Sequence, residues 1–174
     1  MTDAPIAMRA KVRVALLFFV FLGLFNGVYQ VEKRVSGRYL DLPYTSMVTS
    51  GAEFVAQRVL PIPVERRGIA TLGTGCTAVV IRGGCNGIEA VFLLVAGILA
   101  YPASWFLRCH AFLIYLPVLF VLNLLRIVTL LYVMAEHQAY IHTFHDQIAQ
   151  GILVVSVFGM WVHYIYWIER QKIL

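Results

Sequence analysis

Four long apolar runs, separated by more polar segments, dominate the hydropathy pattern of the chain. They cover residues 12–31, 86–101, 111–134 and 148–168. An apolar helix of about 20 residues is long enough to cross the hydrocarbon core of a bilayer. The second run is followed by Pro102, which is expected to kink or end its helix. The pattern predicts an all-α polytopic membrane protein with about four transmembrane helices.

The segment 32–84, between the first two runs, has a mixed pattern. In residues 46–60, apolar side chains alternate with Glu53, Gln57 and Arg58, as is typical of an amphipathic helix at a membrane surface. Residues 69–81 are rich in β-branched side chains on both sides of a Gly-Thr-Gly turn, which predicts a short β-hairpin. We expect a single integral membrane domain over residues 1–174, capped by this loop.

The basic residues at the ends of the runs predict an orientation. Arg9, Lys11 and Arg13 precede the first run, and positively charged flanks stay in the cytoplasm. No small-x-small cleavage site follows the run, so we interpret it as an uncleaved anchor rather than a signal peptide. Four spans then place both termini in the cytoplasm and the loop 32–84 outside. The seven basic residues of that loop do not favour this orientation, but the rule weakens for long loops.

The composition agrees with a membrane protein. Hydrophobic residues make up 60% of the chain and charged residues 13%, and the mean hydropathy is +0.79, which excludes an ordinary soluble domain and a disordered chain. The net charge of +5 is not arranged in a stripe and no nucleic-acid motif accompanies it, so we expect no nucleic-acid partner. Three cysteines, Cys76, Cys85 and Cys109, are too few for a disulfide framework or a four-cysteine zinc site.

One charged residue lies inside a predicted span. Arg126 falls about 12 Å below the outer end of the third run, and Asn123 shares its helix face three residues earlier. A central arginine costs about 2.5–3.5 kcal/mol on insertion scales, so its presence requires a partner or a purpose. One alternative is that Arg126 snorkels or pairs with Glu89 to hold two helices together. The other is that it serves a functional site.

Cys85 opens the second run after two glycines. A cysteine at a helix amino terminus experiences the positive end of the helix dipole, which favours the reactive thiolate. Cys85 is therefore a candidate nucleophile. The alternatives are a small buried residue, or a disulfide with Cys76 in an oxidising compartment.

A third polar cluster, residues 136–147, leads into the fourth run and contains His142, His145 and Asp146. The predicted topology brings this cluster to the same side of the membrane as Cys85. A histidine can deprotonate a thiol and later protonate a leaving amine, and an arginine can stabilise an oxyanion. Acyl transfer by a cysteine enzyme is the chemistry that this set favours. The alternative is a membrane metal- or cofactor-binding protein that uses the same cluster, although a histidine pair spaced at i and i+3 is a weak signal.

Three short motifs carry a family resemblance. They are Cys85-Asn86-Gly87-Ile88-Glu89-Ala90, Asn123-Leu124-Leu125-Arg126-Ile127-Val128 and Phe144-His145-Asp146. In this order and spacing they resemble the exosortase/archaeosortase group of membrane transpeptidases, and most closely its short exosortase H branch. The chain is shorter than typical exosortases, which have about twice as many spans.

The resemblance implies a catalytic set of Cys85, Arg126 and His145, with no cofactor and no metal. Asn123, His142, Asp146 and Glu89 would support this set, and the Phe-His-Asp context favours His145 over His142 as the base. The implied substrate is a membrane-inserted protein whose carboxy-terminal sorting signal consists of a short motif, a transmembrane helix and a basic tail. A lipid or glycan of the cell envelope, or water, would receive the cleaved protein. The implied location is the bacterial cytoplasmic (inner) membrane, with the active site on its extracytoplasmic side.

Overall fold

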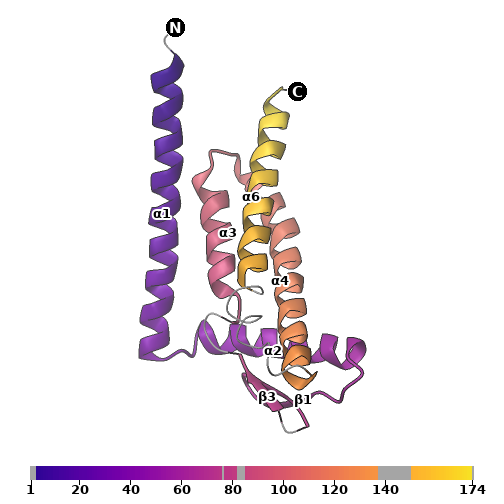
Figure 1. The fold of residues 1–174 in the computed structure, drawn as a ribbon. Helices are drawn as coiled ribbons and strands as arrows, with labels where there is room; N and C mark the ends of the chain where they lie inside the picture. Colours follow the sequence, from indigo (N-terminus) through magenta and orange to yellow (C-terminus); the bar gives the residue numbers. More distant parts are fainter. Residues whose placement is uncertain (1–2, 76, 82–84, 137–149, 174) are drawn as a thin grey trace.

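The computed structural model describes residues 3–75, 77–81, 85–136 and 150–173. The elements are α1 (Asp3–Val35), α2 (Asp41–Val59), β1 (Glu65–Gly68), β2 (Thr71–Thr74), β3 (Thr77–Val80), α3 (Ile88–Ala100), α4 (Trp105–Glu136) and α6 (Gln150–Ile173). Helices α1, α3, α4 and α6 run side by side along one direction, and α2 and the sheet lie at one end of them (Figure 1). Both termini lie at the opposite end, so the α2–sheet layer forms a cap (Figure 1).

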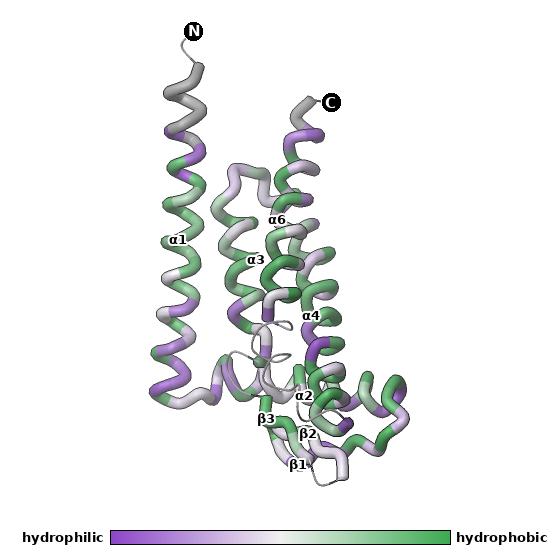
Figure 2. Tube along the Cα trace, in the orientation of Figure 1, coloured by the Kyte–Doolittle hydropathy of each residue, from purple (hydrophilic) through white to green (hydrophobic). Residues whose placement is uncertain are grey.

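The all-α polytopic membrane fold is confirmed. In the part of the chain that the structure describes, three helices are long and apolar enough to cross a membrane, over Lys11–Val35, Trp105–Glu136 and Gln150–Gln171. Figure 2 shows hydrophobic residues along the middle of these helices. Helix α3 is also apolar but has 13 residues, or about 20 Å of length, against about 30 Å for a hydrocarbon core. Residues 86 and 87 form the turn before it and Tyr101-Pro102 ends it, so crossing by α3 stays a prediction.

The cap contains the amphipathic helix that the sequence indicates, beginning five residues earlier than expected, at Asp41. Its buried face consists of small and β-branched residues at helical spacing, namely Thr45, Val48, Thr49, Ala52 and Ala56. Apolar residues of the opposite side, Met47 and Phe54, are exposed instead. This second apolar side suits a helix at a membrane interface.

The expected hairpin is present as β2 and β3, which pair antiparallel from Thr71–Val80 to Thr74–Thr77. The sequence pattern missed β1, which pairs with β2 to give the order β1-β2-β3. Its four residues, Glu-Arg-Arg-Gly, lack the β-branched and aromatic side chains that mark a strand. Arg66 of this strand reaches back to α2, where it donates hydrogen bonds to Ser46 and Ser50.

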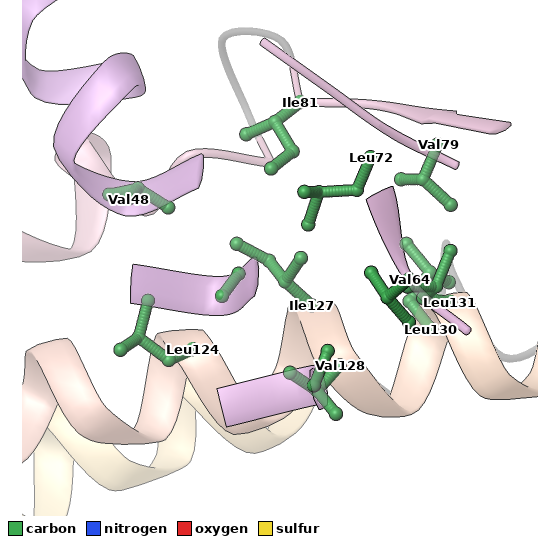
Figure 3. Close-up of a cluster of buried hydrophobic side chains, with 12 residues drawn as sticks. Val48, Val64, Leu72, Val79, Ile81, Leu124, Ile127, Val128, Leu130 and Leu131 are labelled. Carbon is green, nitrogen blue, oxygen red and sulfur yellow. The ribbon is translucent and has the colours of Figure 1, made fainter. Parts of the chain in front are cut away.

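Two buried clusters hold these elements together, and both include α4. The first joins the carboxyl half of α4 to α2 and the sheet, with Leu72, Ile81, Leu124, Ile127 and Leu131 among its members (Figure 3). The second joins the amino half of α4 to α3 and α6. Helix α1 packs chiefly against α3, where Phe92 contacts the rings of Phe25 and Tyr29. The long helix α4 is therefore the common support of the cap and the bundle.

The contact between α3 and α6 depends on Gly97. A Cβ atom at this position would lie 2.7 Å from Cδ1 of Trp161, whereas one at Gly159 of α6 would have no heavy atom within 4 Å. We expect Gly97→Ala to lower the free energy of unfolding by about 1–3 kcal/mol, because the rigid indole must shift. The matched Gly159→Ala should change it by less than about 1 kcal/mol. Unfolding in mixed micelles, followed by circular dichroism, measures both, and equal effects would contradict this packing.

Candidate active site

A close approach between α4 and the turn before α3 organises the site. The Asn123 side-chain amide donates a hydrogen bond of 2.7 Å to the backbone carbonyl of Asn86, and both side chains are almost completely buried. Gly87 has a φ of 79°, in the left-handed region that favours glycine. A Cβ atom there would lie 2.6 Å from Cγ of Asn123. The turn can therefore rest on α4 only because residue 87 is glycine.

The side chain of Asn86 ties the same turn to two other helices. Its oxygen accepts a hydrogen bond of 3.2 Å from the backbone N–H of Ile88, which satisfies one free amide at the start of α3. Its amide donates to Thr45 of α2 at 3.2 Å, and to Asp41 and Tyr29 at longer distances. Buried polar groups are costly unless paired, so this network fixes the position of the turn.

Cys85 directly precedes this anchored turn and is half-buried. Its place at the start of the second apolar run predicts that Cys85 begins the helix, but α3 begins at Ile88 with Gly87 as its N-cap. Cys85 therefore lies two residues ahead of the cap, near the amino end of α3. Cys76 lies outside the described residues, so the alternative of a bridge to Cys85 stays untested. Cys109 is exposed, in the first turns of α4 at the other end of that helix.

Arg126 follows Asn123 by one turn of α4. Nη1 of its guanidinium and Oδ1 of Asn123 are buried, and neither has a hydrogen-bond partner in the described part of the chain. Cys85 and Glu89 both lie within electrostatic range of the guanidinium. Arg126 thus has available hydrogen-bond capacity beside the candidate nucleophile. Its proximity to Glu89 is also what the pairing alternative expects.

A cavity of about 300 Å³ adjoins these groups. Helices α1, α3, α4 and α6 contribute its lining, which includes Asn26, Gly87, Glu89, Arg126 and Gln150. Its polar groups gather at the level of Arg126, while Leu22, Leu93, Leu153 and Val154 form apolar walls. A pocket with apolar walls and a few convergent polar groups is the usual form of a ligand site.

The histidine cluster that the sequence indicates belongs to residues 136–147. His142, His145 and Asp146 lie outside the described residues, and so does any contact they make. Gln150, five residues after His145, is the first residue described beyond them, and it lines the cavity. Among the residues that the structure describes, no group of three His, Cys, Asp or Glu side chains could hold a metal ion.

The sequence pattern does not predict the groups that support the turn. Tyr29, Asp41 and Thr45 meet Asn86 from positions 41 to 57 residues away, and no local spacing connects them. Asn26 was missed for a similar reason, because only the packing of α1 brings it to the cavity. Asn26 and Tyr29 could have been noticed in the sequence only as polar residues within the first apolar run.

The fold and the site define a polytopic membrane protein in which a half-buried arginine lines a cavity and a cysteine lies within electrostatic range of that arginine. The family model described as transmembrane exosortase matches residues 6–163, and the chain belongs to this family. Membership supports a role as a membrane transpeptidase in protein sorting, and the exosortase H resemblance is consistent with it. No curated protein and no solved structure shows significant similarity to the chain.

The close approach of Gly87 to Asn123 can be tested by comparison with a glycine that has a similar backbone conformation. Gly75 also has a positive φ, of 54°, but a Cβ atom there would meet open space. Each alanine substitution is expected to cost about 1–3 kcal/mol of backbone strain. Gly87→Ala should lower the free energy of unfolding by about 2 kcal/mol more than Gly75→Ala, because it also displaces Asn123. Equal losses in the same micelle titration would show that the Asn123 contact does not depend on this glycine.

Proposed function

We propose that this exosortase is a membrane-embedded cysteine transpeptidase that cleaves a carboxy-terminal sorting signal of exported proteins. The observation that carries the proposal is the placement of Cys85 directly before an anchored turn and within electrostatic range of Arg126. A positive charge and a helix amino end both favour the thiolate form of a cysteine. Together with the family, this placement supports Cys85 as the nucleophile.

In the proposed reaction, Sγ of Cys85 attacks the carbonyl carbon of the scissile peptide bond and its proton passes to His145. The carbonyl oxygen becomes an oxyanion, which Arg126 stabilises with its available N–H donor. The carbon–nitrogen bond then breaks, and His145 returns the proton to the leaving amine. The product is a thioester on Cys85. A hydroxyl or amine of an envelope lipid or glycan, or water, attacks this thioester and restores the thiol.

His145 is proposed as the base because of its Phe-His-Asp motif. It precedes Gln150 by five residues, and Gln150 lines the cavity. A connection of five residues reaches at most about 18 Å, which limits how far His145 can lie from the cavity. His142 and Asp146 are proposed to assist or orient it, and Glu89 to balance the charge of Arg126.

The substrate's transmembrane helix would lie along the surface that α1 and α6 line together, and not between them, because the ring centroids of Phe18 and Trp161 are 6.3 Å apart. A second cavity, of about 510 Å³, lies at this surface, with Phe18, Trp161 and Ile165 in its lining and Tyr101-Pro102 at one end. The residues that α1 presents to the two cavities share one face, at positions 11, 14, 15, 18, 19, 22 and 26. An apolar helix placed along this face would bring the residues at its end to Arg126.

Co-expression of the protein with a substrate that carries the sorting signal tests the proposal. Cys85→Ala should abolish processing, because no thioester forms, while Cys109→Ala should leave it unchanged. In the same assay, Arg126→Leu should slow processing by about 100-fold or more through loss of oxyanion stabilisation. Immunoblots of substrate and enzyme measure processing and expression together.

Two results would contradict the mechanism. Continued processing by Cys85→Ala would exclude this nucleophile. Normal processing by Arg126→Leu would favour the structural alternative, because a buried charge that only joins helices can often be replaced by an apolar residue.

The proposed location is the bacterial inner membrane, with the cap and the active site outside. An impermeant maleimide added to spheroplasts should then label Cys85 in a Cys76→Ala background and spare Cys109, since Cys109 lies at the opposite end of the bundle. Permeabilised cells provide the control, in which Cys109 should react because it is exposed. Labelling of Cys109 in intact spheroplasts would reverse the proposed orientation.

A further inference from the structure

A separate cavity with arginines in its lining lies at the end of the bundle that is remote from Cys85. It has a volume of about 490 Å³ and lies between the start of α1 and the turn joining α3 to α4. Arg9, Arg13 and Arg108 line it, and none of its described lining residues is acidic. Three guanidinium groups around one space repel each other unless an anion lies between them.

Arg108 is the fixed member of this group. It is half-buried, its Nη2 donates a hydrogen bond of 3.2 Å to the Tyr101 carbonyl, and its guanidinium lies 5.1 Å from the ring centre of Trp105. Its Nε is buried and has no hydrogen-bond partner in the described part of the chain. The nearby carboxylate of Glu169 accepts a hydrogen bond from the Tyr101 hydroxyl and does not line the cavity. Arg108 therefore lines the cavity from a fixed position and keeps one N–H group without a partner among the described residues.

The other two arginines, Arg9 and Arg13, can bind one ligand together with Arg108. Arg9 and Arg13 are one turn apart on α1, about 6 Å along the helix, and both are exposed. Planar guanidinium groups bind phosphate oxygens in a bidentate manner, so this set matches a phosphoryl group better than a spherical anion.

The rest of the lining is apolar. Val14, Leu17, Leu99, Ala100 and Pro102 complete the cavity, and Val14 and Leu17 follow the arginines into the membrane-spanning part of α1. A free anion would leave this apolar surface uncovered, whereas an acyl chain would cover it. The arginines at the end of the bundle match the charged headgroup of an anionic phospholipid, and the apolar residues next to them match its acyl chain.

We propose that this cavity binds an anionic phospholipid, with its phosphoryl headgroup on Arg9, Arg13 and Arg108 and part of an acyl chain along Val14 and Leu17. The bound lipid links α1, whose helix contacts are chiefly with α3, to the beginning of α4. This site is distinct from the Cys85 site and does not depend on the proposed catalysis.

Native mass spectrometry of the full chain, released from micelles with phosphatidylglycerol or phosphatidylcholine, tests the proposal. The wild-type protein should retain phosphatidylglycerol preferentially. Each arginine near a membrane surface contributes about fivefold to the binding of anionic lipid, so Arg13→Gln/Arg108→Gln should reduce this preference by about 25-fold. Because Arg108 is half-buried, Arg9→Gln/Arg13→Gln, which changes only exposed residues, should show a comparable loss in a folded protein.

Arg170→Gln is the matched control, because Arg170 is exposed on α6 at the same end and does not line the cavity. It should leave the preference unchanged. An equal loss with Arg170→Gln, or no loss in either double variant, would overturn the proposal. Inorganic phosphate alone should give no thermal stabilisation, whereas phosphatidylglycerol should raise the unfolding temperature. Equal stabilisation by inorganic phosphate would assign the cavity to a soluble phosphoryl anion and overturn the lipid assignment.

Discussion

The site depends on one hydrogen bond, from the Asn123 side chain to the backbone of Asn86. This bond brings a polar turn against an apolar helix, and it requires residue 87 to have no side chain. Because Cys85 precedes the turn and Arg126 follows Asn123 by one turn of helix, the same contact brings the two groups together. The constraint therefore converts two distant sequence motifs into one site, and it acts through backbone geometry rather than through Cys85 or Arg126 themselves.

The two apolar clusters make that contact rigid from opposite sides. Leu124 and Ile127, next to Asn123 and Arg126 on α4, belong to the cluster that holds α2 and the sheet. Leu119, one turn earlier, belongs to the cluster that holds α3 and α6. Asn123 and Arg126 thus lie where the cap cluster meets the bundle cluster. Packing on both sides limits the movement of α4 at the one place where it carries polar groups.

The parts of the fold that follow from local pattern could be predicted, and the parts that follow from long-range packing could not. Apolar runs indicated the long helices, and β-branched residues around Gly-Thr-Gly indicated the hairpin. Strand β1 has no such signal, because its place is set by pairing with β2 and by Arg66 reaching α2. In the site, Cys85, Arg126, Asn123 and Glu89 stand out as polar residues in or beside apolar runs. Tyr29 and Asp41 become part of it only through tertiary contacts with Asn86.

The few charges of this chain are used differently at the two ends of the bundle. At the cap end, Arg126 has Cys85 and Glu89 as neighbours in one chain, so the cost of placing a guanidinium in an apolar span is offset from within the protein. At the other end, Arg9, Arg13 and Arg108 surround a cavity whose described lining offers no acidic side chain. Glu169 at this end accepts a hydrogen bond from the Tyr101 hydroxyl and does not line the cavity, so the proposed headgroup would supply balancing charge from outside the chain. An anionic headgroup is the counter-charge that a bilayer itself supplies at that depth, which explains why a chain with so few charged residues can place three arginines around one space.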